Sequence, residues 1–285
     1  MLLSVCIVNW NTCEYLRQCL AALYAYPPRS ADMEVIVVDN ASADGSAQMV
    51  ATQFPQALLI ASAKNNGYAV GNNLALMASQ GDYTLLLNPD VIVGENSLSH
   101  ALQFMQAHPD TGALGCRLVS ADGSTQRTVR GFPDPWPVMF EYLGLARLFP
   151  QSRRFGAYRM TYFDYSQNGE VDQPMGSFLV ISRSCLDQVG LMDAQFPIFF
   201  NEVDWCWRAK REHGWKIYYT ADAVAVHYGG GSTRQVKARM VTESHRSLLR
   251  FYHKHYQGQI APWLYALITW AVLWNERRLL RTAQG

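Results

Sequence analysis

Four short apolar runs, separated by segments with helical spacing, constrain the fold of this chain more than any other feature of its sequence. Nearly continuous apolar runs are typical of strands in a parallel sheet whose two faces are both covered. Strands are predicted at Leu2–Val8, Glu34–Val38, Ala57–Ala61 and Tyr83–Leu87, with helices at Cys13–Tyr26, Ser46–Phe54 and Gly71–Ser79. Right-handed βαβ units of this kind build a doubly wound, nucleotide-binding half of an α/β fold.

Polar residues follow each predicted strand, at the edge where a parallel sheet binds its ligands. These clusters are Asn9–Asn11, Asp39-Asn40, Lys64–Gly67 and Asn88–Asp90. Asn and Asp also favour turns, but four clusters at one sheet edge favour a binding cleft. No Gly-x-Gly-x-x-Gly follows the first strand and no Gly-x-x-x-x-Gly-Lys occurs, so the usual dinucleotide and P-loop fingerprints are absent.

The rest of the chain continues with helices and short strands. Residues 131–174 are rich in Pro, Gly and aromatic residues, and a connection of this length is uncommon unless it is functional or mobile. The predicted helices are Val138–Phe149, Asn201–His213, Val236–Tyr256 and Trp263–Arg281, and the predicted strands are Gly176–Ser182, Lys216–Thr220 and Ala223–His227.

Charge is scarce in this chain and unevenly distributed. Only 16% of the residues are charged, against roughly 25% in a typical soluble domain. The net charge of +1 combines −6 over residues 1–233 with +7 over residues 234–285. This balance disfavours general nucleic-acid binding, whereas the basic C-terminal segment could seek an anionic surface.

Targeting signals and cysteine usage favour a cytoplasmic location. The N-terminus has no basic region and no small-residue cleavage site, so no signal peptide is expected. No run reaches the roughly 20 apolar residues that a spanning helix needs. The six cysteines include no Cys-x-x-Cys pair and no zinc spacing, which favours free, buried thiols in a reducing compartment.

Two aspartates at predicted strand ends are candidate ligand-binding residues. Asp90 could hold Mg²⁺ or Mn²⁺ whose other ligands come from a substrate's phosphates, or it could belong to a turn that opens the next helix. Asp39 lies too far ahead of the following helix to cap it, whereas Ser42 or Asp44 could do so. The predicted role of Asp39 is therefore a hydrogen bond to a nucleoside.

Glu202 and Asp204 begin a predicted helix, and their i, i+2 spacing points them about 200° apart. One could face the cleft while the other pairs, for instance with Arg208, or both could simply stabilise the positive helix end. The apolar run before Glu202 would raise its pKa on burial, as suits a general base. His227, which precedes Tyr and three glycines, is either structural or close to a charged ligand.

Taken in order, these motifs resemble the inverting, metal-dependent glycosyltransferases of family 2, which adopt the GT-A fold. The segments that carry the resemblance are Ser4–Asn11, Val38–Ser46, Asn65–Asn73, Leu87–Val91, Gly176–Arg183 and Asn201–Arg208. The resemblance implies a GT-A catalytic domain over residues 1–233 with a mixed central sheet. Residues 1–120 would form its Rossmann-like, nucleotide-sugar-binding half, and residues 121–233 its acceptor-binding and base half. C-terminal helices over residues 234–285 would complete the α/β fold.

The resemblance also implies roles for the matching residues that bind the donor and the metal. Asp39 would contact the pyrimidine base of a nucleoside-diphosphate sugar. Asp90 would hold Mg²⁺ or Mn²⁺, and His227 would complete the metal or diphosphate site. Asn88 stands where the family often has the first Asp of its Asp-x-Asp motif. The other donor-binding residues would be Asn9, Asn11, Asn65, Gly67 and Asn73.

For catalysis, the resemblance implies that Glu202 is the base, with Asp204 as the second candidate. The rhamnosyltransferase-like subset of the family implies bacterial surface-polysaccharide synthesis. Thymidine-diphosphate rhamnose is then the first donor candidate, and a saccharide or lipid-linked saccharide is the acceptor. The alternative is a non-catalytic nucleotide-sugar or glycan-binding protein on the same fold.

The C-terminal segment is typical of a helix at a membrane interface. Pro262 can occupy its first position, and the following Trp263–Trp274 is apolar nearly all round. Twelve residues span about 18 Å, less than the roughly 30 Å core of a bilayer. The tryptophans and the arginines that follow suit peripheral contact through residues 262–281 at the inner face of the cell membrane. Docking on the catalytic domain or on a second copy in a homodimer is the alternative.

Overall fold

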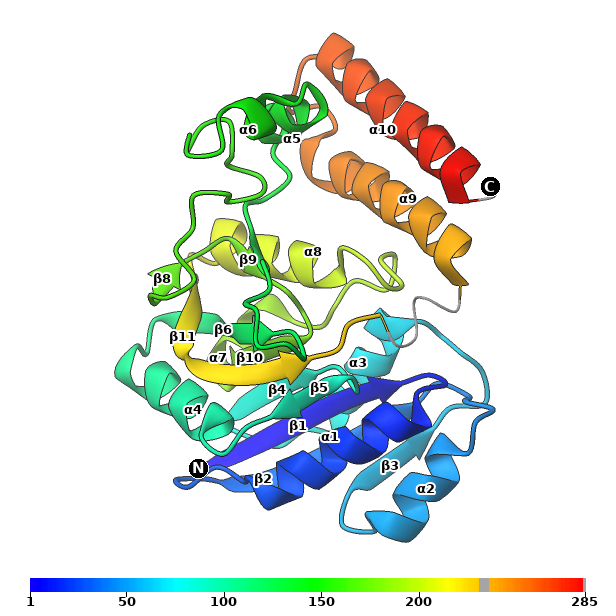
Figure 1. Ribbon diagram of the computed structural model, residues 1–285, viewed down its shortest axis with the longest axis vertical. Coiled ribbons are helices and arrows are strands. Elements are labelled where there is room, and N and C mark those ends of the chain that lie inside the picture. The colour runs from blue at the N-terminus through cyan, green and yellow to red at the C-terminus, as the bar shows by residue number, and fades with distance from the viewer. Residues whose placement is uncertain (231–235, 284–285) are drawn as a thin grey trace.

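The computed structural model of the protein describes residues 1–230 and 236–283, with a nine-stranded sheet at its centre (Figure 1). Its path is β3 (Leu58–Ala61), β2 (Asp32–Asp39), β1 (Leu2–Asn9), β4 (Tyr83–Leu87), β10 (Phe178–Ser182), β6 (Thr111–Val119), β11 (Lys216–His227) and β5 (Val91–Val93), with β8 (Gly169–Glu170) paired to β11. Strands β3, β2, β1 and β4 are parallel, whereas β10 is antiparallel to both β4 and β6. The predicted α/β fold with a mixed central sheet is confirmed.

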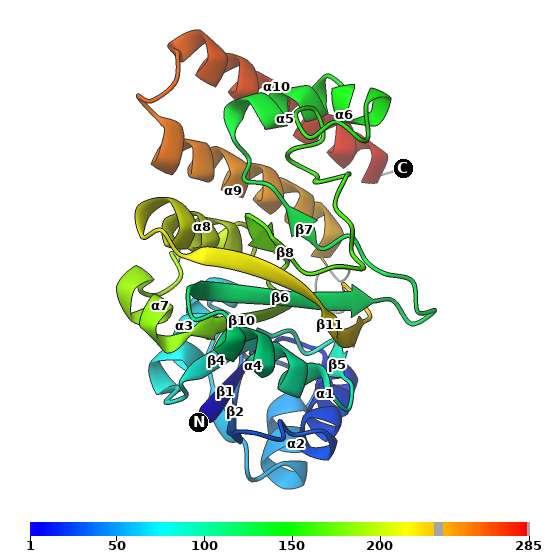
Figure 2. The same ribbon diagram turned by 90° about the vertical axis from the view of Figure 1, so that its left-hand side faces the viewer.

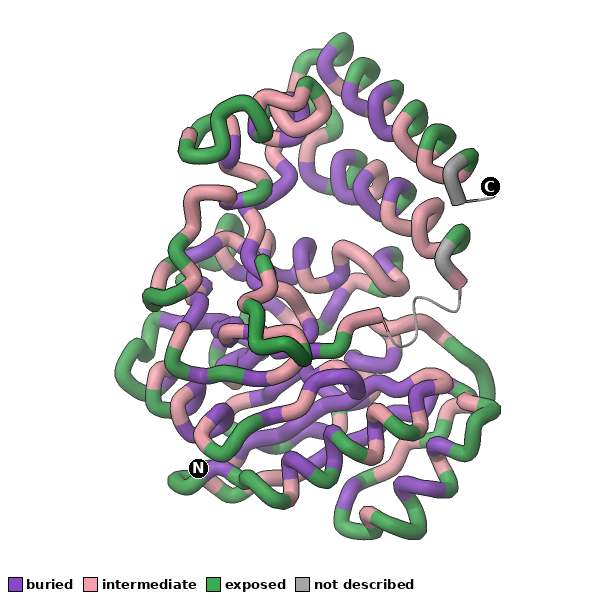
Figure 3. The backbone as a smooth tube through the Cα atoms, viewed as in Figure 1, coloured by how far each residue is buried: buried purple, intermediate pink, exposed green. Residues whose placement is uncertain are grey.

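The alternation of side chains along each strand divides the core into two layers. In β1, Val5 and Ile7 belong to one apolar cluster, whereas Cys6 and Val8 belong to the other. Helices α1 (Cys13–Ala25), α2 (Ser46–Gln53) and α4 (Ser97–Ala107) cover the first face, and α3 (Tyr68–Ala78), α7 (Arg183–Val189) and α8 (Asn201–Trp207) cover the second. Because both faces are covered, the central strands are mostly apolar, and β1 is buried from Leu3 to Asn9 (Figure 3).

Three elements between residues 91 and 119, namely β5, α4 and β6, had no sequence prediction. β5 has only three residues, too few for a periodic signal. β6 contains Gly112 and Gly115, which weaken a strand pattern. A Cβ on Gly115 would lie 2.3 Å from the Cβ of Pro174, so this glycine allows a close approach of β9 (Gln173–Pro174), which pairs with β7 (Val129–Arg130) in a small second sheet.

Two predicted boundaries were wrong for local reasons. The predicted strands Lys216–Thr220 and Ala223–His227 form the single strand β11, because a register shift absorbs the residues between them as a bulge. The predicted helix Val138–Phe149 is instead two helices, α5 (Pro135–Tyr142) and α6 (Leu145–Leu148). They are separated at Gly144, whose φ of +74° ends the first helix.

Helices α9 (Lys237–Tyr256) and α10 (Pro262–Ala283) form an antiparallel pair at the end of the molecule away from β2 and β3 (Figures 1 and 2). Phe251 of α9 packs with Val203 of α8, and Ile268 of α10 belongs to a cluster with Met139 of α5. In the two described ranges, no helix is both long and apolar enough to cross a bilayer. The predicted domain boundary between residues 233 and 234 lies outside the described residues.

Candidate active site

A cavity of about 390 Å³ opens where the carboxyl ends of β1 and β4 meet the start of β10 and helix α8. Four of the predicted site residues line it: Asn88, Asp90, Glu202 and His227. Asn88 and Asp90 are more than 100 residues away in sequence from Glu202 and His227. The fold therefore brings the predicted metal ligands and the predicted base to a single cavity.

Glu202 lies in the first turn of α8 and lines this cavity. A Cβ on Gly176 would lie 3.3 Å from the Cβ and Cγ of Glu202, so the glycine leaves room for the acid. Burial raises the pKa of Glu202 to about 7, although backbone amides at Glu202 and Val203 oppose the shift. The carboxylate makes no ion pair with any residue that the structure describes. An acid whose pKa is raised in this way can take up a proton at neutral pH.

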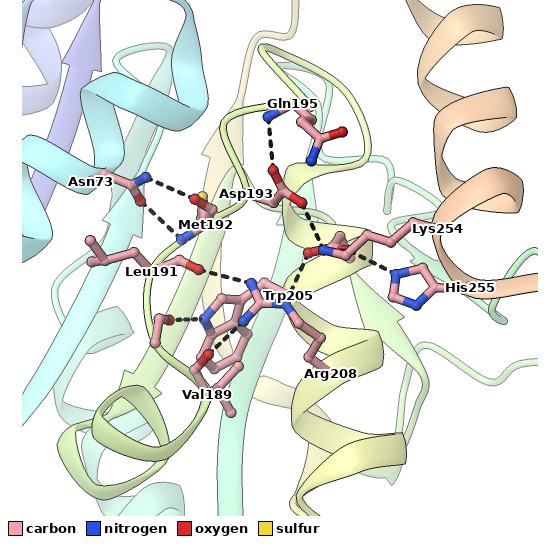
Figure 4. A network of polar contacts seen from close by, with 12 residues as sticks. Asn73, Val189, Leu191, Met192, Asp193, Gln195, Trp205, Arg208, Lys254 and His255 are labelled. Carbon is pink, nitrogen blue, oxygen red and sulfur yellow. Dashed lines mark hydrogen bonds and ion pairs between the residues drawn. The ribbon is translucent and has the colours of Figure 1, made fainter.

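Asp204 lies on the opposite side of α8 and is fully buried. Its Oδ2 accepts a hydrogen bond from Arg208 Nε at 3.0 Å, while Lys254 Nζ and His255 Nε2 each lie 2.7 Å from its Oδ1. Figure 4 shows these three cationic or imidazole groups converging from α8 and α9. Burial would raise the pKa of Asp204, but these hydrogen bonds and charges hold it below its ordinary value. The predicted pairing with Arg208 is confirmed, and Asp204 does not line the cavity.

Asp90 and His227 are buried side by side, with 3.6 Å between Asp90 Oδ1 and His227 Nε2. Gln126 holds the histidine at two points: its Oε1 lies 2.8 Å from His227 Nδ1, and its Nε2 donates to the His227 carbonyl at 2.8 Å. Because an amide oxygen only accepts, Nδ1 carries the proton and the Nε2 lone pair faces Asp90. Burial lowers the pKa of His227, although the Asp90 carboxylate opposes the shift.

A carboxylate oxygen and a neutral imidazole nitrogen fit a divalent cation as two of its ligands. Gln126 supplies the second hydrogen bond that ligating histidines usually make. Within the described part of the chain, no group of three His, Cys, Asp or Glu residues could hold a metal ion. The protein would therefore contribute Asp90 and His227, and the diphosphate of a donor would contribute the remaining oxygens.

Asn88 lines the cavity, and its side-chain nitrogen and oxygen each make a hydrogen bond within the protein. Its Nδ2 donates to Ser177 Oγ at 3.0 Å, and its Oδ1 accepts from the Tyr68 hydroxyl at 2.8 Å. These bonds join the end of β4 to α3 and to the segment before β10. Asn88 thus fixes the turn that presents Asp90.

Asn9, Asn11 and Asp39 lie at the ends of β1 and β2 in one hydrogen-bonded group outside the cavity lining. Asn9 Nδ2 donates to Asp39 Oδ1 at 3.0 Å, and Asp39 Oδ2 accepts from the Ser42 amide at 2.9 Å. The Asn11 amide donates to Ser42 Oγ. Of the two predicted caps, Ser42 donates its amide to Asp39, whereas Asp44 Oδ1 accepts from the amide of Ser46, the first residue of α2, at 3.1 Å.

Asn65, Gly67 and Asn73 also lie outside the cavity lining, around the start of α3. Asn65 Oδ1 accepts from the Gly67 amide at 2.9 Å. Gly67 has a φ of +87°, and a Cβ there would lie 2.8 Å from the Pro197 carbonyl oxygen. Asn73 exchanges two hydrogen bonds with the Met192 backbone, at 2.8 and 2.9 Å (Figure 4). These residues tie α3 to the segment that leads into the cavity wall.

Tyr68, Gln126 and Ser177 belong to the site but were not predicted. Tyr68 and Ser177 lie inside the segments that resemble the family, so their position next to Asn65–Asn73 and Gly176 could have suggested them. Gln126 comes from the connection between β6 and β7 and has no motif around it. Its contact with His227, 101 residues away, is visible only in the folded chain.

Solved structures of other proteins share this architecture. The mannosyltransferase PcManGT from Pyrobaculum calidifontis, in complex with GDP-Man and Mn²⁺, matches 99% of this chain and 72% of its own, with a TM-score of 0.62 and 19% identity. Residues 1–349 of S. aureus TarS in complex with UDP match 90% of this chain and 72% of their own, with a TM-score of 0.54 and 17% identity. The fold is that of the GT-A glycosyltransferases.

Sequence comparison identifies the family within this fold class. The model of glycosyl transferase family 2 matches residues 4–169, more than half of the chain, so the chain belongs to this family. The N-acetylglucosaminyl-diphospho-decaprenol L-rhamnosyltransferase of Mycobacterium tuberculosis is 27% identical over 95% of this chain and 89% of its own length. A low-salt glycan biosynthesis hexosyltransferase of Haloferax volcanii is 26% identical over 74% of this chain and 62% of its own length.

Proposed function

We propose that this family 2 glycosyltransferase moves a sugar from a nucleoside-diphosphate donor to an acceptor hydroxyl with inversion at the anomeric carbon, and that Glu202 is its base. The observation that carries the proposal is the placement of a carboxyl group with a pKa raised to about 7 in the same cavity as Asp90 and His227. Asp204 is unsuited to this task because its two oxygens already accept hydrogen bonds from Arg208, Lys254 and His255.

The proposed step is a single displacement. The acceptor oxygen bonds to the anomeric carbon while its proton passes to a Glu202 carboxylate oxygen. The bond between the anomeric carbon and the diphosphate oxygen breaks, and the diphosphate leaves with the electron pair on the opposite face, which inverts the configuration. A divalent cation, Mg²⁺ or Mn²⁺, held by Asp90 and His227 would neutralise negative charge on the diphosphate.

The donor would lie along the ends of β1, β2 and β4. Asp39 accepts two hydrogen bonds within the protein, which leaves carboxylate lone pairs for an N–H of a pyrimidine base. Asn9 and Asn11 would support this nucleoside site. The residues that would shape the ribose and diphosphate region are Asn65, Gly67, Asn73 and Asn88.

Thymidine-diphosphate rhamnose and a lipid-linked saccharide are the proposed substrates. The relative from Mycobacterium tuberculosis, an N-acetylglucosaminyl-diphospho-decaprenol L-rhamnosyltransferase, supports rhamnose as the sugar and a lipid-linked saccharide as the acceptor. The setting would be bacterial surface-polysaccharide assembly at the inner face of the cell membrane. Residues 262–281 would supply a peripheral contact there.

Turnover of candidate donors tests this proposal. The purified protein is incubated with thymidine-diphosphate rhamnose or a uridine-diphosphate sugar, with and without Mn²⁺, and with a polyprenyl-diphosphate N-acetylglucosamine acceptor. Release of nucleoside diphosphate together with one new anomeric signal of inverted configuration in the product is the expected result. Donor binding without any product or donor hydrolysis would instead identify a non-catalytic nucleotide-sugar-binding protein.

A further inference from the structure

Helix α10 exposes a continuous row of large apolar side chains. Trp263, Leu267, Trp270 and Trp274 are spaced by four, three and four residues, which places them on one side of the helix. Their exposed fractions range from 41% to 62%, whereas Ile268 on the other side is 1% exposed and packs inward. Exposed positions recur along this outer side of the helix in Figure 3. The last turns of α10 add exposed arginines at Arg277, Arg278 and Arg281.

Helices α5 and α6 carry a second exposed apolar patch next to α10. Its four members are between 51% and 71% exposed: Trp136, Leu143, Leu148 and Phe149. Exposed arginines accompany them at Arg147, Arg153 and Arg154. The buried side of α5 places Met139 in the same apolar cluster as Leu264 and Ile268 of α10. The two patches therefore belong to one packed unit at one end of the molecule (Figures 1 and 2).

This end differs from the rest of the described surface. Nine of the sixteen exposed large apolar residues in the described ranges lie on α5, α6 or α10 or in the residues directly after α5 and α6, and these nine include every exposed tryptophan. Such a concentration marks an interaction surface rather than scattered exposure. Tryptophan is the residue that best suits a boundary between apolar and wet environments.

We propose that α5, α6 and α10 together form a docking surface for an anionic lipid bilayer, with the tryptophans and leucines entering the headgroup boundary and the arginines contacting lipid phosphates. This proposal rests on the proposed function in one respect. The membrane that the surface contacts would be the one that carries the lipid-linked acceptor. The proposal adds α5 and α6 to the contact predicted for residues 262–281.

The positive charge of this surface favours an anionic bilayer, rather than a second copy of the chain, as its binding partner. The two patches bring six exposed arginines, and acidic residues in the same segments are Glu141, which pairs with Arg159, and Glu276. A two-fold dimer through this surface would place the same arginine-rich patch opposite itself, because such interfaces are self-complementary. An anionic bilayer offers the opposite charge over the whole patch.

Vesicle flotation with the full-length protein tests the surface. Phosphatidylcholine vesicles with about one third phosphatidylglycerol are compared with phosphatidylcholine alone. We expect the wild type to float with the anionic vesicles, and high salt to reduce this fraction. We expect Trp270→Glu and Leu148→Glu each to lower it at least about fivefold, because each brings a negative charge to the lipid boundary. Met77→Glu, an equally exposed position on α3, is the matched control and should float like the wild type.

Three outcomes would overturn the inference. Unchanged flotation of Leu148→Glu, with its melting temperature retained, would remove α5 and α6 from the surface. Equal binding to neutral vesicles would remove the role of the arginines. A dimer that Trp270→Glu dissociates, with no vesicle binding by the wild type, would assign the surface to a second copy. Turnover with a water-soluble saccharide acceptor is measured in parallel, so a failure of docking and a failure of the proposed glycosyl transfer are distinguished.

Discussion

The two faces of helix α8 hold carboxyl groups that are two residues apart in sequence and whose pKa values are shifted in opposite directions. Glu202 faces the cavity, where burial raises its pKa to about 7 and no described residue forms an ion pair with it. Asp204 faces α9, where Lys254 and His255 join Arg208 around a fully buried carboxylate whose pKa is lowered. Burial alone therefore does not decide the role of an acid. The charged and hydrogen-bonding side chains in contact with the carboxylate decide it.

The C-terminal segment also has a structural role next to α8. Lys254 and His255 reach α8 from α9, about 50 residues further along the chain. The ring centroid of His255 also lies 3.9 Å from that of Trp207 on α8, and the Tyr256 hydroxyl donates to Asp134, which precedes α5. Helix α9 thus stabilises the helix that carries the proposed base.

The largest expected effect follows from Glu202→Gln. The amide keeps the shape of the side chain but cannot accept the acceptor's proton, so we expect turnover to fall by about 10²–10⁴-fold. Donor affinity, measured by calorimetry, should change little. Turnover close to that of the wild type would show that Glu202 is not the base.

A smaller but still large effect is expected from Asp90→Ala. Loss of the carboxylate leaves His227 as the one cavity residue proposed to bind the metal, so the gain in nucleotide affinity on adding Mn²⁺ should drop by about 10–100-fold. Calorimetry with and without Mn²⁺ measures this gain. Asp122→Ala, in an exposed turn, is the control and should behave as the wild type. Unchanged metal-dependent affinity in the Asp90 variant would contradict the proposed metal site.

The smallest effect on turnover, and the clearest effect on stability, is expected from Asp204→Asn. Removing the charge leaves Arg208 and His255 without a carboxylate partner and Lys254 with Asp193 alone, which should lower the free energy of unfolding by about 2–3 kcal/mol. That figure lies below the usual cost of breaking a fully buried pair because Lys254 is partly exposed. Turnover of the folded variant should remain within about threefold of the wild type. A loss as large as that of Glu202→Gln, without loss of stability, would reverse the roles of the two acids.

The pH dependence of this stabilisation has a definite sign. The folded-state pKa of Asp204 lies below its ordinary value, so the stabilisation is complete above that ordinary value. It is lost as the pH falls through the lower folded-state pKa. The difference in unfolding free energy between wild type and Asp204→Asn should therefore shrink in acid, as urea titrations at several pH values would show.

The sequence predicted the parts of the molecule that depend on local patterns. Apolar strands ending in polar residues identified the sheet edge, and Asn88, Asp90, Glu202 and His227 do meet at one cavity. The rest depends on contacts between distant segments, which no local pattern encodes. Sequence spacing did not predict that a residue of α9 contacts Asp204. It also did not predict the hydrogen bond between Gln126 and His227.

The pH profile of kcat/KM tests the difference between Glu202 and Asp204 most directly. The wild type should gain about tenfold in kcat/KM per pH unit below about pH 7 and level off above it, because Glu202 must lose its proton to act as a base. Asp204→Asn should keep this acid limb, and the residual activity of Glu202→Gln should lack it. A flat wild-type profile, or an acid limb that persists in Glu202→Gln and disappears in Asp204→Asn, would contradict the account.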